Sequence, residues 1–156
     1  MSMAYLAQGA EHQQLEWLDH SVMRVLLDGA ATEGQLTMLR TSLPEGAASP
    51  VHLHSNEDEM FVLLSGSGIF WFGDERWELG EGGVVYLPRN VPHAYRFTSA
   101  VDLLTICTPS GSEGFFRKAG HDLSTPKPEG WAITPATLGE AAAAHGVTIV
   151  GPPRPA

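Results

Sequence analysis

The residues of this chain with the clearest chemical potential are three histidines and one glutamate in two short, glycine-bounded blocks. These residues are His52, His54, Glu59 and His93. Imidazole nitrogens and carboxylate oxygens together suit a divalent transition metal such as Fe, Ni, Mn, Co, Cu or Zn. The residue types therefore predict a centre that binds one such ion, without distinguishing between these metals.

The spacing of the four residues suits a β scaffold. Side chains alternate between the two faces of a strand, so His52 and His54 would point to the same side. The polar residues 55–58 resemble a turn, and we expect a hairpin-like return that brings Glu59 beside the two histidines. A carboxylate on the same strand face as Phe61 needs a partner, because an unpaired buried charge is very costly. A metal ion would be such a partner.

Two neighbouring acids compete with Glu59 for the place of the fourth ligand. Glu57 and Asp58 lie in the polar segment, whereas Glu59 begins an apolar run, and this favours Glu59. We expect Glu57 and Asp58 to be solvated in the turn. The remaining histidines lie outside both blocks and are interpreted as surface or structural residues. They are His12, His20, His121 and His145.

Short apolar runs separated by turn residues recur along most of the chain. They are rich in β-branched, aromatic and aliphatic residues, as strands are. Many short strands with glycine turns favour an all-β sandwich or barrel, a class that includes jelly rolls. We expect a barrel core over about 20–110. The predicted strands are 22–27, 36–42, 59–64, 69–72, 76–79, 84–87, 94–97 and 101–107.

The C-terminal part, about 111–156, has a different pattern that predicts one or two short helices and a loop. Residues 110–113 resemble a capping box before a helix at 114–119. Thr134 resembles an N-cap with a proline after it, which predicts a second helix through about His145. The final GPPRPA is expected to be extended or mobile. At the other end, residues 1–20 are interpreted as either an arm or a first strand. This segment is also a candidate for part of a dimer interface.

Length, composition and charge restrict the class of protein. The chain has 156 residues and 43% hydrophobic content, which favours one folded domain over 1–156. Its net charge of −9 argues against nucleic acids and anionic membranes as partners. No apolar run approaches the roughly 18 residues of a transmembrane helix, and the N-terminus does not resemble a signal peptide. We therefore expect a cytoplasmic protein.

Three further residues have both a structural and a functional interpretation. The single cysteine, Cys107, lies in an apolar run and is expected to be a buried strand residue rather than a nucleophile. Arg89 and Arg96 are candidates for binding an acidic substrate, but surface positions are the favoured interpretation.

The two blocks resemble the two sequence motifs of the cupin superfamily. The first motif, G(X)5HXH(X)4E(X)6G, is matched at every fixed position from Gly46 to Gly66. The second, G(X)5PXG(X)2H(X)3N, is matched by its first glycine, its proline and His93. Asn90 replaces the third fixed residue and Phe97 replaces the last. Asn tolerates positive φ better than most residues, so Asn90 is expected to preserve the turn.

More of the chain, from Glu59 to about Gly120, resembles single-domain cupins that are similar to bacterial quercetin 2,3-dioxygenases. The resemblance implies that the three histidines and Glu59 hold the metal, and that Glu59 also acts as a base toward the substrate. It further implies a homodimer and, as substrates, flavonols. Aromatic residues on the same strands are predicted to line the substrate pocket. They are Phe61, Phe72, Tyr95 and Phe97.

Three functions agree with these features. The first is a metal-dependent dioxygenase that uses O2 on a small aromatic or enolic molecule. The second is a non-oxidative cyclase or isomerase of polyketide-like substrates, in which Glu59 or Tyr95 transfers a proton. The third is a domain that binds a small molecule without catalysis. The same fold hosts many reactions, so the fold alone does not choose between them.

Overall fold

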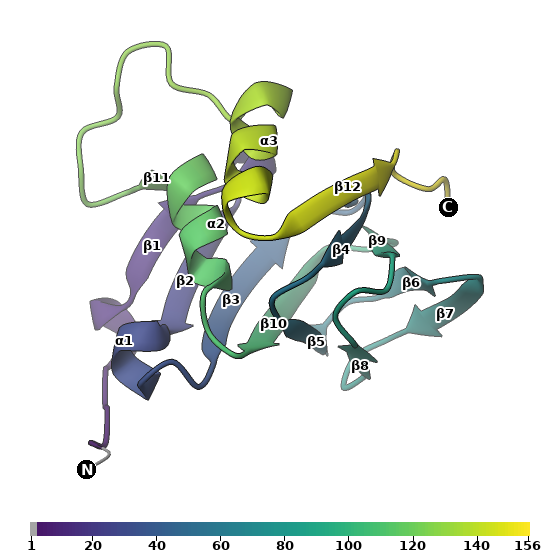
Figure 1. The fold of residues 1–156 in the computed structure, drawn as a ribbon, viewed down its shortest axis with the longest axis horizontal. Helices are drawn as coiled ribbons and strands as arrows, with labels where there is room; N and C mark the ends of the chain where they lie inside the picture. The colour runs from purple at the N-terminus through teal and green to yellow at the C-terminus, as the bar shows by residue number, and fades with distance from the viewer. Residues whose placement is uncertain (1–2) are drawn as a thin grey trace.

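The computed structural model describes residues 3–156 as two antiparallel β-sheets with helices beside them (Figure 1). The first sheet has seven strands in the order β11-β1-β2-β3-β10-β5-β8, and the second has five in the order β12-β4-β9-β6-β7. The first sheet comprises β1 Gln13–Glu16, β2 Val22–Leu27, β3 Thr37–Leu43, β5 Asp58–Ser65, β8 Val84–Leu87, β10 Val101–Thr108 and β11 His121–Asp122. The second comprises β4 Val51–His54, β6 Gly68–Phe72, β7 Glu75–Leu79, β9 His93–Phe97 and β12 Val147–Gly151.

Helices are confined to the connections and the C-terminal part. The α-helices are α1 Gly29–Thr32, α2 Ser112–Ala119 and α3 Pro135–Ala144, with single 3-10 turns at Gly9–Glu11 and Leu18–His20. The predicted second C-terminal helix is confirmed, because Thr134 caps α3 by accepting from the Thr137 N–H. No helix among residues 3–156 has the length and apolar character needed to span a membrane.

The first sheet has one buried face, which two different layers cover. Burial alternates strictly along β10, as expected for a strand with one face in the core. The half of the sheet around β5, β8 and β10 packs against the second sheet, with Phe61, Phe70 and Phe97 in that core. The half around β1, β2 and β3 packs against α2 and α3, with Trp17 and Met23 in a second core. Figure 1 shows both helices over this part of the first sheet.

The structure confirms the all-β jelly-roll prediction and all eight predicted strands, with ends that shift by at most a few residues. It also answers the question about the N-terminal segment. Gln13–Glu16 is a strand that pairs with β2 and β11 of the same chain, whereas residues 1 and 2 lie outside the described part. The C-terminal part contributes to the same fold, because β12 pairs with β4.

The predicted hairpin between His54 and Glu59 is wrong. The strand of the two histidines, β4, belongs to the second sheet, and β5 belongs to the first. Residues 55–58 therefore cross from one sheet to the other. The C-terminal end of α3 holds this crossing, because the Ser55 N–H donates to the Gly146 carbonyl (2.9 Å) and Asn56 Nδ2 donates to the His145 carbonyl (3.3 Å).

The expected capping box at residues 110–113 is not formed, and Glu113 instead joins α2 to the first sheet. Its carboxylate accepts from the backbone N–H groups of Gly29 (2.9 Å) and Gly111 (2.8 Å) and from the Thr37 hydroxyl. Burial acts to raise the pKa of Glu113, but these hydrogen bonds outweigh it and lower the pKa. Thr37 is fully buried, so its hydroxyl has no access to water and depends on this carboxylate.

Replacing Glu113 with alanine should therefore lower the free energy of unfolding by about 1–3 kcal/mol, because the buried Thr37 hydroxyl loses its acceptor. Equilibrium unfolding in urea would measure the change. Glu129→Ala, at an exposed loop position, is the matched control and should change stability little. Equal stabilities of the two variants would contradict this role of Glu113.

Candidate metal centre

The two sheets bring together the four residues that the sequence predicts as ligands. His52 and His54 lie on β4 and His93 lies on β9, where it pairs directly with His52. Glu59 approaches from β5 of the opposite sheet. One ligand atom from each of the four residues lies within 4.8 Å of the others. His54, Glu59 and His93 are buried and His52 is half-buried.

Each imidazole is held by a hydrogen bond at Nδ1. The His52 Nδ1 lies 2.9 Å from the Pro50 carbonyl, and the His93 Nδ1 lies 3.2 Å from the Val91 carbonyl. These acceptors carry no hydrogen, so each Nδ1 is the protonated nitrogen. Each Nε2 then keeps a free lone pair, which is the arrangement of a metal-binding histidine with an outer hydrogen-bond partner.

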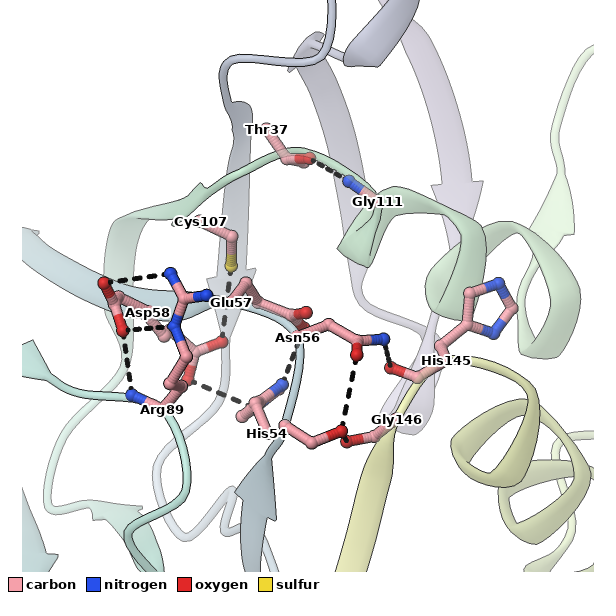
Figure 2. Close-up of polar contacts among 12 residues, drawn as sticks. Thr37, His54, Asn56, Glu57, Asp58, Arg89, Cys107, Gly111, His145 and Gly146 are labelled. Carbon is pink, nitrogen blue, oxygen red and sulfur yellow. Dashed lines mark hydrogen bonds and ion pairs between the residues drawn. The ribbon is translucent and has the colours of Figure 1, made fainter.

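His54 differs from the other two histidines because a carboxylate holds it. Its Nδ1 lies 2.8 Å from Oε1 of Glu57, which is 3% exposed (Figure 2). The expectation that Glu57 is solvated in a turn is therefore wrong. The sequence neighbours of Glu57 are polar and do not indicate that it is buried. Glu57 is buried because residues 55–58 cross between the two sheets. Glu57 is an outer partner of the cluster that orients His54 and increases its basicity.

The inner nitrogens of the cluster have no hydrogen-bond partner. Among the described residues, Nε2 of His54 and Nε2 of His93 are buried and unpartnered. Both face Oε1 of Glu59, at 3.7 Å and 3.3 Å respectively. A buried nitrogen without a partner costs free energy, and a cation between these atoms would satisfy all of them at once. The donor set thus fits a divalent transition metal.

The electrostatics of the cluster agree with this fit. Burial would raise the pKa of Glu59, but the imidazoles of His54 and His93 outweigh it and lower the pKa to about 2. Burial, helped by His93, lowers the pKa of His52 to about 4. At neutral pH, Glu59 is therefore a carboxylate and His52 is neutral, which are the forms that bind a cation.

Cys107 is a buried strand residue, as expected, and its side chain also contacts the cluster. It lies opposite Glu59 in the β5–β10 register, and its Sγ is 3.8 Å from Oε2 of Glu59 (Figure 2). Burial raises the pKa of the thiol well above its usual value, with the nearby Glu59 charge acting in the same direction. Cys107 is therefore a protonated thiol that donates to Glu59 rather than a nucleophile.

The two candidate arginines have surface roles. Arg89 forms an ion pair with Asp58 (Nε to Oδ1, 3.0 Å), and its hydrogen bonds lower the pKa of Asp58 to about 2 (Figure 2). Arg96 donates to the carbonyls of Arg154 (2.7 Å) and Gly46 (3.3 Å), and so holds the C-terminal tail. Neither side chain lines the cavity beside the metal cluster.

A cavity of about 140 Å³ lies beside the cluster and is partly open to the surface. His52, His54 and Glu59 form part of its wall, together with Phe61 and Tyr95. Burial raises the pKa of Tyr95, so its hydroxyl is protonated at neutral pH.

The other two aromatic residues that the sequence placed in the pocket do not line this cavity. Phe97 is 1% exposed and packs in the core against Phe70. Phe72 stacks on Trp77 at the other end of the second sheet, with ring centres 5.7 Å apart. Both side chains pack in the core between the sheets, so of the four predicted aromatic residues only Phe61 and Tyr95 line this cavity.

The backbone explains two fixed positions of the sequence motifs. Asn90 has a φ of 65°, so asparagine preserves the turn that glycine usually makes there, and its N–H donates to the His54 carbonyl (2.7 Å). Gly66 has a φ of 86°, and a Cβ there would lie 2.2 Å from the Ala100 carbonyl oxygen. Both residues therefore meet backbone demands next to the ligand strands.

Comparison with known proteins agrees with this architecture. The family model described as "Cupin domain" matches residues 39–108, which include all four cluster residues. This match covers a little under half of the chain, so the likeness to cupins concerns its central part. The matched segment extends from β3 to β10, whereas α2, α3 and β12 lie outside it and line part of the cavity.

Three relatives illustrate the likeness. A quercetin 2,3-dioxygenase of Bacillus subtilis is 26% identical over 120 residues, which are 76% of this chain and 35% of that protein. An uncharacterised protein of Methanocaldococcus jannaschii is 27% identical over 90 residues, 57% of this chain and 72% of that one. The structure of KdgF from Halomonas sp. superposes with a TM-score of 0.61 and 14% identity, covering 70% of this chain and 98% of that chain. This chain spans about a third of the dioxygenase, and the structural likeness concerns the fold alone.

The outer partner of His54 leads to a prediction about metal affinity. Replacing Glu57 with alanine should raise the metal Kd about 10–100-fold, because His54 loses the carboxylate that orients it. Competition with a chromophoric chelator would measure the Kd. Glu75→Ala, at an exposed position on β7, is the matched control. An unchanged Kd in Glu57→Ala would show that this hydrogen bond has no part in metal binding.

Proposed function

We propose that this protein is a metal-dependent cupin enzyme that acts on a small aromatic or enolic molecule with O2 as the co-substrate. One divalent transition metal ion would be held by His52, His54, Glu59 and His93. The observation that carries the proposal is the convergence of buried, unpartnered Nε2 atoms on Oε1 of Glu59, next to a cavity.

Such an ion, when bound, lowers the pKa of a coordinated enol or hydroxyl group and supplies redox chemistry toward O2. Four protein ligands leave one or two positions open on most of the candidate metals. The side chains around the ion would orient the substrate, transfer its proton and exclude water.

Glu59 is the group that we assign to proton transfer. It is ionised at neutral pH, and its Oε1 faces the centre of the cluster, so it can accept the proton of a substrate hydroxyl group there. Cys107 holds the other oxygen, which keeps the carboxylate oriented. Phe61 and Tyr95 form an aromatic wall that would position a planar substrate and exclude water.

The likeness to a protein named quercetin 2,3-dioxygenase supports an oxidative reaction and makes flavonols the first substrates to test. The likeness covers only part of that protein. The proposal therefore concerns the reaction at the metal cluster of this chain and not the remaining parts of that protein.

Substrate-dependent O2 uptake tests the proposal. Protein loaded separately with Fe, Ni, Co or Mn would be screened with flavonols and other enolic compounds in an oxygen electrode, with product analysis. The proposal predicts O2 consumption in equal amount to product with at least one metal, and none with metal-free protein. Product without O2 uptake would indicate a non-oxidative cyclase or isomerase. Binding without any product would indicate a binding domain.

A further inference from the structure

The cavity continues from the metal cluster into a space between the two hydrophobic cores. One wall is formed by the barrel and the other by α2, α3 and β12. Away from the cluster, its lining is mostly apolar. This part of the wall includes Trp17, Met23, Leu103, Phe115, Phe116 and Leu138. Phe115, Phe116 and Leu138 lie on α2 and α3, which are outside the matched range 39–108, so this wall of the cavity is a feature of this chain's own extension.

The lining contains no positively charged anchor. Among the described residues that form it there is no lysine or arginine, and the acidic residues are Glu57 and Glu59. The two arginines that the sequence made candidates for binding an acidic substrate, Arg89 and Arg96, are bound to Asp58 and to backbone carbonyls. A ligand whose body carries a negative charge would bury that charge in an apolar space without a counterion, which is strongly unfavourable.

The lining does contain neutral polar groups without partners. Thr41 is 3% exposed and Ser112 is 4% exposed, and neither hydroxyl has a hydrogen-bond partner among the described residues. Thr41 pairs with Leu103 on β10, whereas Glu59 pairs with Cys107 of the same strand. Four residues along a strand span about 13 Å, so the Thr41 hydroxyl lies well away from the metal cluster. A buried hydroxyl is best satisfied by a neutral donor or acceptor.

We propose that the substrate is an uncharged molecule with a metal-binding oxygen group at one end and an apolar body that extends between the barrel and α2 and α3. A neutral polar group on this body would reach Thr41 or Ser112. The inference rests on the proposed function, because it places the substrate's oxygen group at the open positions of the metal. It excludes substrates that carry a carboxylate or phosphate on the body.

Three hydroxamates with the same metal-binding group test the proposal on Co(II)-loaded protein. Acetohydroxamate has the group alone, octanohydroxamate adds an apolar chain, and suberic monohydroxamate has a carboxylate at the end of that chain. Titration followed by the cobalt absorption spectrum gives each Kd. Octanohydroxamate should bind at least about tenfold tighter than acetohydroxamate, because each buried methylene adds favourable transfer free energy. The carboxylate at the chain end should remove most of that gain.

Two variants in α3 test whether the alkyl chain of octanohydroxamate binds in this cavity. Ala142 is 4% exposed and lines the cavity, so Ala142→Leu should reduce the preference for octanohydroxamate over acetohydroxamate to less than about threefold. Ala143→Leu, at the neighbouring exposed position, should keep the full preference. If Ala142→Leu does not fold, Leu138→Phe narrows the same cavity. Equal affinities of the three probes, or a preference that survives both cavity substitutions, would overturn the proposal.

A failure of the proposed function would look different. If acetohydroxamate leaves the cobalt spectrum unchanged, the metal has no open position, and the enzyme proposal fails. The cavity is then tested on metal-free protein by calorimetry with 1-octanol and octanoate, which differ in charge. Tighter binding of 1-octanol supports the cavity inference, and equal or weaker binding overturns it.

Discussion

Replacing His93 with alanine should abolish stable metal binding. His93 is 2% exposed, its Nε2 is one of the two nearest nitrogens to Oε1 of Glu59, and no other histidine on the described chain is placed to substitute for it. Loss of an outer partner costs about 10–100-fold in metal affinity, so loss of a ligand should cost more than about 100-fold. Elemental analysis after dialysis would give the bound metal per chain. His52→Ala should behave in the same way.

The control for this prediction is His20→Ala, because the His20 side chain is 93% exposed and lies outside the cluster. Circular dichroism of both variants would check that the fold is retained. If His93→Ala keeps normal metal occupancy, the assignment of the cluster is wrong. The wild-type protein should also lose thermal stability when a chelator removes the metal, because an ion that binds only the folded state stabilises it.

Replacing Glu59 with glutamine should lower turnover per bound metal by about 100-fold or more, the contribution of a positioned proton acceptor. The amide has the same shape but cannot accept a proton in the same way or balance the charge of the cation. Because Glu59 is also a ligand, metal content and rate must be measured on the same sample at saturating metal. The rate is then expressed per bound ion, which separates proton transfer from metal loss.

Glu75→Gln is the matched control for Glu59→Gln, since Glu75 is exposed on β7. A rate per bound metal within a few-fold of wild type would remove Glu59 from the proton-transfer role and leave it as a ligand only. A loss of rate that exogenous carboxylates such as acetate partly restore would support the assigned role.

The four residues of the cluster and most strands were predictable from the sequence because both depend on local patterns. Alternation of apolar residues indicates strands, and a pair of histidines two residues apart shares one face of a strand. The pairing of the strands was harder to predict from the sequence. Residues 55–58 have the composition of a hairpin turn, but the bonds that make them cross between the sheets come from Gly146 and His145, about ninety positions away in the chain.

The same reason explains why β12 and Glu57 were missed. The five residues of β12 become a strand because β4 offers an unpaired edge, which is a property of the folded sheet. Glu57 looks like a solvated acid because its sequence neighbours are polar, and only the position of His54 gives it a buried role.

The aromatic residues predicted for the pocket show a further limit of prediction from sequence. Tyr95 and Phe97 share one face of β9, yet the first lines the cavity and the second is enclosed in the core. Alternation predicts the face of a strand but not the depth at which the cavity ends. That depth is set by the opposing sheet and by the helices α2 and α3.

The most direct test of the account is elemental analysis of untagged protein purified without chelators, followed by reconstitution with Fe, Ni, Co and Mn. The account predicts close to one transition metal ion per chain, with binding that depends on His52, His54, Glu59 and His93. Protein that contains no metal as purified and takes up none of the four ions would contradict the metal centre and, with it, the proposed enzyme.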